Sequence, residues 1–474
     1  MQQQSLIATS IPNRFYLAVW RWHFYAGLFV IPFLIVLACS GMLMLLKDPL
    51  ESYRYGHLLH VEPNGAALAP QAQLAAVARQ YPHSVARLYI PPRSADSASQ
   101  FAVSPAHGVH DDGGHSSHAE STITVFVDPY SGRVLGELDP AQTLYAWANT
   151  LHASLFLGDV GDYLIEIAAG FGVLLTVSGL FLWWPRDSRW RDAVLPRVAF
   201  ARRADWRNLH AGLGFWLAGA LLFFLISGLT WTSIWGGKLT QAWNSFPAEK
   251  SAPLADKTHG SLNRPPLDEV PWVLEQTPMP ASGSLAGTAG IAAGAAVELD
   301  SIVALAKQQG FERFRVNMPR AADDVWTISA AAMAGDVADP RDERTVHVDR
   351  HSGHVLADVG FTDYSLPGKA MTLGVPLHQG SLGVWNIVIN LCFCLAVIAM
   401  TVTGIVMWWL RRPVGRRGMV PPPLPSDLGA WKSAIAAMFV LSLCFPLVAI
   451  TIAAVIALDL LVIARIPALR VLLR

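Results

Sequence analysis

The sequence predicts an integral membrane α-helical bundle of four core transmembrane helices plus a C-terminal hydrophobic segment. The bundle arises from a tandem repeat that also carries two α+β domains outside the membrane. Apolar residues make up 53% of the 474-residue chain and charged residues only 15%, whereas soluble domains contain about 45–50% and about 25%. Lys plus Arg (35) equals Asp plus Glu (35). The absence of a basic excess excludes nucleic acid as a partner.

Uncharged runs long enough to cross a bilayer, about 20 residues, define the predicted spans. They cover residues 24–46, 167–184, 209–237, 384–410 and 433–458. The first run is too long for a cleaved signal peptide, and no small-residue cleavage site follows it. The last stretch, residues 433–474, is predicted as a fifth span or a re-entrant segment, with Pro446 at a kink or turn.

Arginine-rich loops predict the orientation of these spans. Residues 185–208 and 411–432 are the basic loops, and short basic loops stay in the cytoplasm. The N-terminus is then also cytoplasmic. The long segments 47–150 and 238–376 fall on the opposite side, which for a bacterial inner membrane is the periplasm. Lipid is therefore an expected partner.

The predicted domain order follows from the spans and loops. The first half consists of a cytoplasmic N-terminus with the first span (1–46), a first periplasmic domain (47–150), a histidine-bearing segment with the second span (151–184) and a basic loop (185–208). The second half consists of the third span (209–237), a second periplasmic domain (238–376) with an Ala/Gly/Pro-rich linker at 278–296, and a histidine-bearing segment with the fourth span (377–410). A cytoplasmic loop (411–432) and the C-terminal segment (433–474) follow.

The chain contains the same motifs twice, in the same order. The matched pairs are His23-x-x-x-Gly27 with His210-x-x-x-Gly214, residues 124–135 with 345–356, Leu151-His152 with Leu377-His378, and Trp183-Trp184 with Trp408-Trp409. Each copy therefore consists of a helix, an exterior domain and a second helix. Both copies begin and end in the cytoplasm, so the repeat axis is predicted to lie along the membrane normal.

Each exterior domain is predicted as a helix followed by a short β-meander. Residues 71–80 and 300–309 have helical spacing, and residues 87–92 and 313–319 have the pattern of strands. Val125 and Val127 alternate with other residues in one copy, as Val346 and Val348 do in the other. The sequence Asp-x-x-Ser-Gly supplies the turn after each of these strands.

The repeat singles out four of the fifteen histidines. His23 and His210 lie at the cytoplasmic starts of their helices, and His152 and His378 lie shortly before the return helices at the other face. Neutral imidazole is a strong ligand for haem iron, and helix bundles build cofactor sites from facing helices. We therefore predict two haem b groups, one held by His23 and His210 and the other by His152 and His378. The alternative for each histidine is a hydrogen bond to lipid headgroups.

Glycines at matched positions fit this prediction. Gly41 and Gly228 lie about five helical turns beyond His23 and His210, on the same helix face, where they leave room for a flat ring held by the other histidine pair. Gly179 and Gly404 are expected to leave room for the ring between His23 and His210, and Gly27 and Gly214 add space one turn after those histidines. Close helix packing is the alternative explanation for these glycines.

The remaining histidines are less specific. His107, His110, His115 and His118 form a run that could bind a transition metal weakly, although a solvated loop is favoured. His347, His351 and His354 surround the second Asp-x-x-Ser-Gly turn. They are expected to be surface histidines, with weak metal or substrate contact as the alternative.

These motifs resemble the PepSY-associated transmembrane family, whose members are often called iron-regulated membrane proteins. The resemblance covers most of residues 14–412. It implies PepSY-like periplasmic domains and, by analogy with some relatives, an inner-membrane reductase that releases iron from a ferric siderophore or other Fe(III) complex during iron uptake. It also implies that His23, His210, His152 and His378 are axial haem ligands. Catalytic residues beyond these stay unidentified.

The electron donor must lie outside the chain. Neither cytoplasmic loop contains G-x-G-x-x-G, and both are too short for a dinucleotide-binding unit. Electrons would come from a quinol or a cytoplasmic reductase. The rival prediction is a PepSY-type periplasmic binding or regulatory protein without redox activity. A transporter is disfavoured because Glu166 and Asp459 lie near the ends of their segments rather than at mid-membrane.

Overall fold

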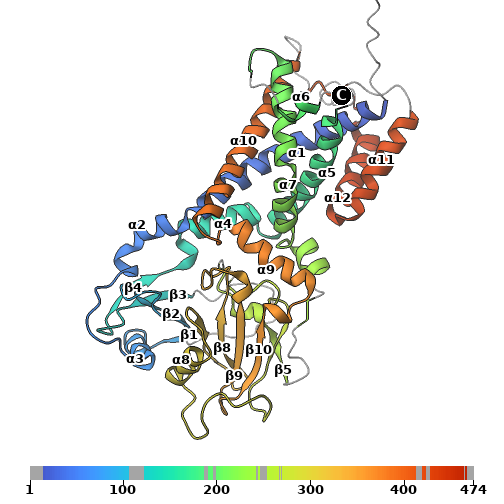
Figure 1. The fold of residues 1–474 in the computed structure, drawn as a ribbon. Coiled ribbons are helices and arrows are strands. Elements are labelled where there is room, and N and C mark those ends of the chain that lie inside the picture. The colour runs from blue at the N-terminus through green and yellow to red at the C-terminus, as the bar shows by residue number, and fades with distance from the viewer. Residues whose placement is uncertain are drawn as a thin grey trace, which may run out of the picture. The chain divides into compact units, whose positions relative to one another are not determined.

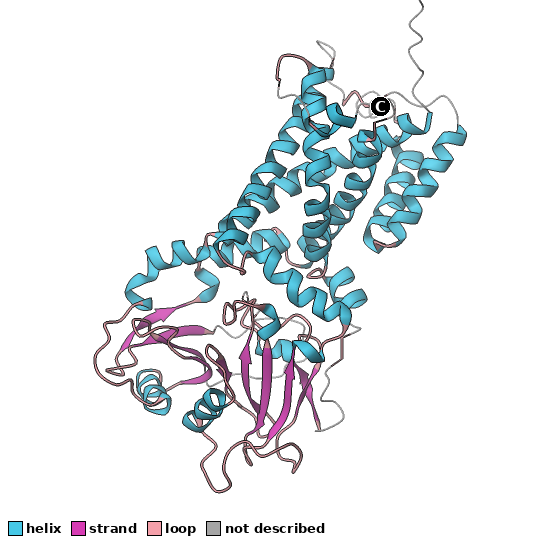
Figure 2. Cartoon of the chain, viewed as in Figure 1, coloured by secondary structure: helices cyan, strands magenta, loops and turns pink. Residues whose placement is uncertain are grey.

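The computed structural model describes residues 14–105, 122–185, 190–195, 199–241, 244–245, 253–265, 267, 269–412, 419–422, 428–463 and 465–466. The chain divides into two compact units. We name Met1–Cys39, Leu151–Gly237 and Cys392–Arg474 the helical unit, and Ser40–Thr150 with Lys238–Leu391 the sheet unit. All strands of the described chain belong to the sheet unit (Figure 2).

Four helices of the described chain are long and apolar enough to cross a membrane, as the sequence predicts. They are α1 (Arg14–Leu45), α5 (Asp159–Trp183), α7 (Arg203–Leu229) and α10 (Val384–Arg411) (Figure 1). Glycines allow close packing against α5. A Cβ at Gly172 would lie 3.0 Å from Leu225 Cδ1 of α7, and one at Gly170 would collide with Val448.

The predicted third span ends earlier than expected. Its apolar run continues to residue 237, but α7 ends at Leu229 and a separate π-helical turn, η2, covers Ser233–Thr240. Two acidic side chains of α5 explain the break. Asp162 accepts a hydrogen bond from the backbone N–H of Ser233 (3.0 Å), and Glu166 accepts from the N–H groups of Ile234 (3.2 Å) and Trp235 (3.1 Å). These carboxylates satisfy the free donors at the start of η2.

The C-terminal hydrophobic stretch forms two helices rather than one. α11 (Leu428–Leu443) and α12 (Pro446–Leu458) are joined at Cys444 and Phe445, directly before Pro446, and a π-helical turn, η8 (Asp459–Ile463), follows. The two helices contact each other and α5 (Figure 1). Proline is favoured in the first turn of a helix, where a backbone N–H would have no partner within the helix, and Pro446 occupies this position in α12. Trp235 fixes the junction by donating its indole N–H to the Cys444 carbonyl (3.0 Å).

The sheet unit contains one antiparallel eight-stranded sheet in the order β10-β9-β8-β7-β1-β2-β3-β4. Its strands are β1 (Ser84–Ile90), β2 (Ser99–Pro105), β3 (Ile123–Val127), β4 (Val134–Leu138), β7 (Arg315–Asn317), β8 (Val325–Ala330), β9 (Arg344–Asp349) and β10 (Val355–Gly360). A separate ribbon pairs β5 (Leu254–Thr258) with β6 (Pro278–Pro280). The predicted strands at 87–92 and 313–319 correspond to β1 and β7.

The two predicted exterior domains are therefore not separate domains in the structure. β1 of the first segment pairs with β7 of the second, with Leu88 opposite Asn317 and Tyr89 opposite Val316. Both segments fall in the same compact unit. The sequence pattern marks the strands of each segment, but nothing in it indicates that the two meanders share an edge.

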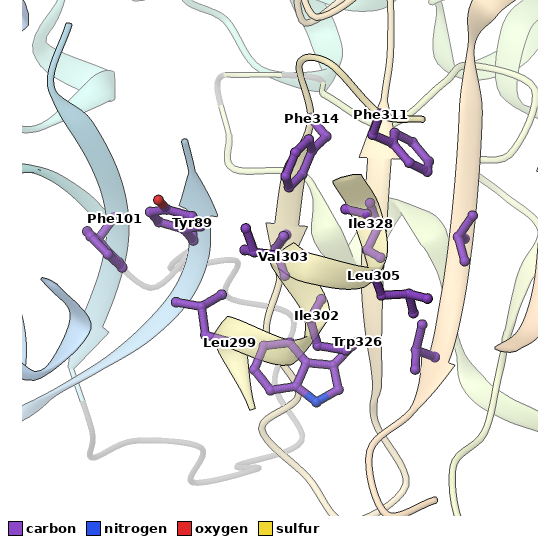
Figure 3. Close-up of a cluster of buried hydrophobic side chains, with 14 of the residues drawn as sticks. Tyr89, Phe101, Leu299, Ile302, Val303, Leu305, Phe311, Phe314, Trp326 and Ile328 are labelled. Carbon is purple, nitrogen blue, oxygen red and sulfur yellow. The ribbon is translucent and has the colours of Figure 1, made fainter. Parts of the chain in front are cut away.

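Two helices pack on this sheet and close its core. The predicted helices appear as α3 (Pro70–Gln80) and α8 (Leu299–Gln308), and they contact each other. Leu299 and Ile302 of α8 are fully buried beside Tyr89 and Phe101 of the first segment (Figure 3). The shared core explains why the two segments form one unit, since burial of apolar area is the main favourable term in folding.

Shorter elements complete the chain. They are α2 (Lys47–Leu59), η1 (Pro140–Gln142), α4 (Leu144–Ser154), α6 (Trp190–Val194), η5 (His259–Leu262), η6 (Pro340–Asp342), η7 (Phe361–Asp363) and α9 (Leu366–Gln379). Two of them matter for the site, because α4 carries His152 and α9 carries His378.

Candidate cofactor site

His23 of α1 is held against α5 by a hydrogen bond and a glycine. Its Nδ1 lies 2.9 Å from Ser178 Oγ. Ser178 donates its own hydroxyl proton to the Leu175 carbonyl (3.1 Å), so its oxygen accepts from His23 Nδ1–H. The proton therefore sits on Nδ1, and Nε2 carries the lone pair. The neighbouring Gly179 makes room for the ring, because a Cβ there would lie 3.2 Å from His23 Cε1.

His210 of α7 has the same arrangement against α10. Its Nδ1 lies 3.1 Å from the Met400 carbonyl and 3.0 Å from Thr403 Oγ1. A carbonyl can only accept, and Thr403 donates its hydroxyl proton to the same carbonyl (2.7 Å). His210 Nδ1 must therefore be protonated, which again leaves the lone pair on Nε2. A Cβ at Gly404 would lie 3.5 Å from His210 Cε1.

The two histidines form a matched pair within the helical unit. They lie close enough for the charge on one ring to act on the other. Metal-binding histidines usually donate their second ring N–H to an oxygen acceptor, which fixes the tautomer and the ring orientation. Both rings meet this condition through Nδ1. The described chain shows no hydrogen bond to either Nε2, so the donor atoms and their tautomers fit an iron ligand.

The predicted packing glycines differ in what surrounds them. Gly179 and Gly404 contact the histidine rings themselves, so they make room for the ligand rather than for the flat ring expected between the ligands. A Cβ at Gly27 would lie 3.9 Å from Leu175, and one at Gly214 would meet nothing within 4 Å. Gly41 and Gly228 lie partly buried in α1 and α7. The open side of Gly214 is consistent with the space predicted there.

The second predicted pair occupies two different units. His152, at the end of α4, belongs to the helical unit and forms a hydrogen bond with the backbone of Leu37. His378, at the end of α9, belongs to the sheet unit, and its backbone carbonyl accepts a hydrogen bond from Asn390 Nδ2 (3.0 Å). Their joint ligation stays a prediction.

The histidine-rich run His107, His110, His115 and His118 lies outside the described residues. Within the part of the chain that the structure describes, three or more His, Cys, Asp or Glu side chains do not gather in any metal-binding group. Haem is compatible with this finding, because its porphyrin supplies the other iron ligands and the protein needs to provide only two.

A buried histidine pair in the sheet unit is the feature that sequence reasoning missed. His259 Nε2 lies 2.9 Å from His347 Nε2, and both side chains are buried. His259 Nδ1 donates to the Thr277 carbonyl (2.9 Å), and Thr327 Oγ1 lies 2.9 Å from His347 Nδ1. His347 is thus a core residue rather than the expected surface histidine. No motif surrounds His259 that would have identified it.

Burial keeps both imidazoles of this pair neutral. Desolvation lowers the pKa of His259 to about 4, against a smaller opposing effect of its bond to Thr277. Desolvation and the neighbouring His259 lower the pKa of His347 well below its usual value. Neutral rings permit one N–H···N bond between the two Nε2 atoms, whereas protonation of both would place two N–H groups against each other.

A buried ion-pair network stabilises the same part of the sheet. Arg264 makes a bidentate contact with Glu269 (2.7 Å for each N–O pair), and Arg315 bonds to Glu269 and to Asp336. Although burial opposes ionisation, the two guanidinium groups lower the pKa of Glu269 to about 2. Arg264 also donates to Thr124 Oγ1 of β3 (3.1 Å). The network therefore connects the second chain segment to the first.

The comparisons with known proteins add one finding about identity. A family model described as "PepSY-associated TM region" matches residues 20–411. This range includes all four predicted ligand histidines and more than half of the chain. A search of curated proteins gave no match.

Proposed function

Because this chain belongs to the PepSY-associated transmembrane family, we propose that it is a haem-containing inner-membrane reductase that transfers electrons to an Fe(III)-siderophore or another ferric complex in the periplasm. The single observation that carries the proposal is the matched pair His23 and His210. Each ring has its proton fixed on Nδ1 by an oxygen acceptor, its lone pair on Nε2, and a glycine against Cε1.

The matching of these two environments also supports the proposed tandem repeat. Ser178-Gly179 on α5 and Thr403-Gly404 on α10 are the corresponding hydroxyl–glycine pairs in the two copies. Each holds the histidine of its own copy. A histidine that only bonded to lipid headgroups would not need a hydroxyl acceptor and a glycine at the same two positions in both copies.

In this proposal the chain's own residues bind and orient the cofactors. His23 and His210 would hold one haem b, and His152 and His378 a second. Haem supplies a one-electron iron couple. Ser178 and Thr403 fix the tautomers of the first ligand pair, and the apolar helices exclude water around it. Reduction of the substrate's Fe(III) to Fe(II) weakens binding by hard oxygen ligands, so electron delivery itself releases the metal.

Other features of the chain agree with this function. Glu166 Oε2 accepts two backbone N–H groups of η2, a capping role that differs from that of a carboxylate in a transporter pathway. The orientation is proposed from the arginine bias of the loops, with the sheet unit in the periplasm. The electron donor is proposed to be a quinol or a cytoplasmic reductase.

The function can be tested with purified protein in lipid nanodiscs. After reduction with dithionite and removal of the excess, an Fe(III)-siderophore is added and Fe(II) is measured with a colour-forming chelator. We expect about two Fe(II) per chain, one for each proposed haem, and about half of that from His23→Ala or His210→Ala, which keep the second haem. His351→Ala, an exposed histidine of the sheet unit, is the matched control. Equal Fe(II) formation by all variants would refute the proposal.

A further inference from the structure

The two Asp-x-x-Ser-Gly turns have the same sequence pattern but different surroundings. In the second copy, residues 282–291 of the linker form a strap over the turn at 349–353. Gly283 donates its N–H to Asp349 Oδ2 (2.6 Å), and Ile291 donates to the Gly353 carbonyl (2.9 Å). The strap therefore binds the turn through its own backbone.

The strap also pairs with the edge of the sheet. Thr288 N–H donates to the Val355 carbonyl (2.9 Å), and Val355 N–H donates back to the Thr288 carbonyl (2.8 Å). Gly287, at φ +89°, lies so close to Val355 that a Cβ there would be 2.3 Å from its carbonyl oxygen. A segment that pairs with this edge therefore needs an extended backbone and a glycine directly before the paired residue, as Gly287 precedes Thr288.

In the first copy the corresponding edge is open. Val134 of β4 matches Val355 in the repeated motif, and β4 is the last strand of the sheet. Within the described chain, no segment pairs with the outer side of Val134. Its N–H and C=O are the same donor and acceptor that Thr288 binds in the other copy. An open strand edge is a template for another strand.

A pocket of about 540 Å³ lies beside the Asp-x-x-Ser-Gly turn of the first copy. It is lined by residues 57 and 60–64 and by Asp128, Tyr130, Ser131, Arg133 and Leu135. Two of these lining residues, Asp128 and Arg133, match Asp349 and His354, which the strap contacts in the second copy. Leu68 lies beside the turn, because a Cβ at Gly132 would be 3.0 Å from its Cδ1. Ile291 has the same position beside Gly353.

The polar groups of the pocket suit a polypeptide backbone. Arg133 stands where His354 lies 3.4 Å from the Ala286 carbonyl of the strap, so its exposed guanidinium can donate to a carbonyl there. Asp128 retains acceptor capacity on Oδ2, the atom whose counterpart in Asp349 binds Gly283. Together with Val134, these groups offer donors and acceptors at the sequence positions that match those of the occupied copy.

We propose that this pocket is a binding site for an extended polypeptide segment of a partner protein, which adds to the outer edge of β4 with a glycine next to the paired residue. Such strand addition obtains affinity from main-chain hydrogen bonds and specificity from the neighbouring pocket. The site is independent of haem and of the proposed reductase activity.

The test uses the full chain in nanodiscs and a labelled synthetic peptide with the sequence of residues 282–291, Ser-Gly-Ser-Leu-Ala-Gly-Thr-Ala-Gly-Ile. Fluorescence anisotropy measures binding, and a photoreactive group on the peptide maps its position. We expect saturable binding and cross-links within residues 57–64 and 128–135. N-methylation of the peptide's threonine nitrogen removes one backbone hydrogen bond and should weaken binding about three- to tenfold.

A protein variant provides a second criterion. Arg133→Ala should weaken binding several-fold, whereas Arg79→Ala, an exposed arginine of α3, should not. Both side chains are on the surface, so neither change should prevent folding. Absence of saturable binding, binding insensitive to N-methylation and to Arg133→Ala, or cross-links at residues 349–356 instead would each overturn the proposal.

Discussion

The buried pair His259 and His347 predicts an acid-dependent loss of protection in the sheet unit. Replacement of His259 by Gln keeps a hydrogen-bonding side chain but removes a titratable group. In the folded chain the pKa of His259 is lowered by burial to about 4, against 6.5 for an exposed histidine. The folded state thus binds fewer protons than the unfolded state in the window between these values. Its contribution to stability is complete above pH 6.5 and is lost as the pH falls toward 4.

The magnitude follows from these two pKa values. For His259 alone, linkage makes the folded state about 2 kcal/mol less stable at pH 5 than at pH 7. Glu343 acts in the opposite direction. Burial raises the pKa of its carboxyl to about 8, although its bond from Ala332 N–H opposes this, so acid stabilises the fold through Glu343. The pH dependence of stability in wild type therefore contains the effects of both His259 and Glu343. The difference between wild type and His259→Gln isolates the effect of the histidine.

Hydrogen–deuterium exchange of the amides in β8 and β9 can measure this difference in the full chain. After correction for intrinsic exchange rates, wild type should lose about thirtyfold more protection than His259→Gln between pH 7 and pH 5, as about 2 kcal/mol requires. His351→Gln, on the exposed turn beside the same strand, should follow wild type. Parallel profiles for wild type and His259→Gln would refute the reasoning.

Three further predictions follow from particular contacts. Glu269→Gln leaves two buried guanidinium groups without their shared carboxylate and should cost about 3–5 kcal/mol in thermal unfolding of the sheet unit; a cost below about 1 kcal/mol would contradict the network. Asn390→Leu leaves the His378 carbonyl at the end of α9 without its side-chain donor, while the Leu377 carbonyl keeps its bond from Asn386, and should cost about 1–3 kcal/mol, measured as faster amide exchange in α9; unchanged exchange would argue against it. Gly404→Val pushes a side chain into the His210 ring and should lower haem content by half or more in a pyridine haemochrome assay, whereas Gly219→Val, whose surroundings are open, should not; equal losses would count against the site.

Much of the fold could be predicted from the sequence because local patterns decide it. Hydrophobic length identifies the four spans, and periodicity with turn chemistry locates α3, α8, β3 and β9. Long-range choices were not predictable. The pairing of β1 with β7 joins segments more than 200 residues apart, and the end of α7 depends on carboxylates of α5 rather than on the apolar run that continues past it.

The candidate site, like the fold, could be predicted where local motifs mark it but not where long-range contacts decide it. Duplication singled out His23 and His210, and the structure places both in one unit with matched partners. The roles of Ser178 and Thr403 were not foreseen, because a hydroxyl one position before a glycine is common in membrane helices and gives no signal of its own. His259 was missed for a similar reason, since only the fold brings it to His347.

The central claim is that iron-porphyrin is bound between histidines of the duplicated helices. The most direct measurement is the absorption spectrum of haem-supplied, purified protein before and after dithionite, together with the ratio of haem to chain. The claim requires two b-type haems per chain, sharp reduced α bands, and loss of about one haem in His23→Ala or His210→Ala. A protein without a Soret band, or full haem content in both variants, would contradict it.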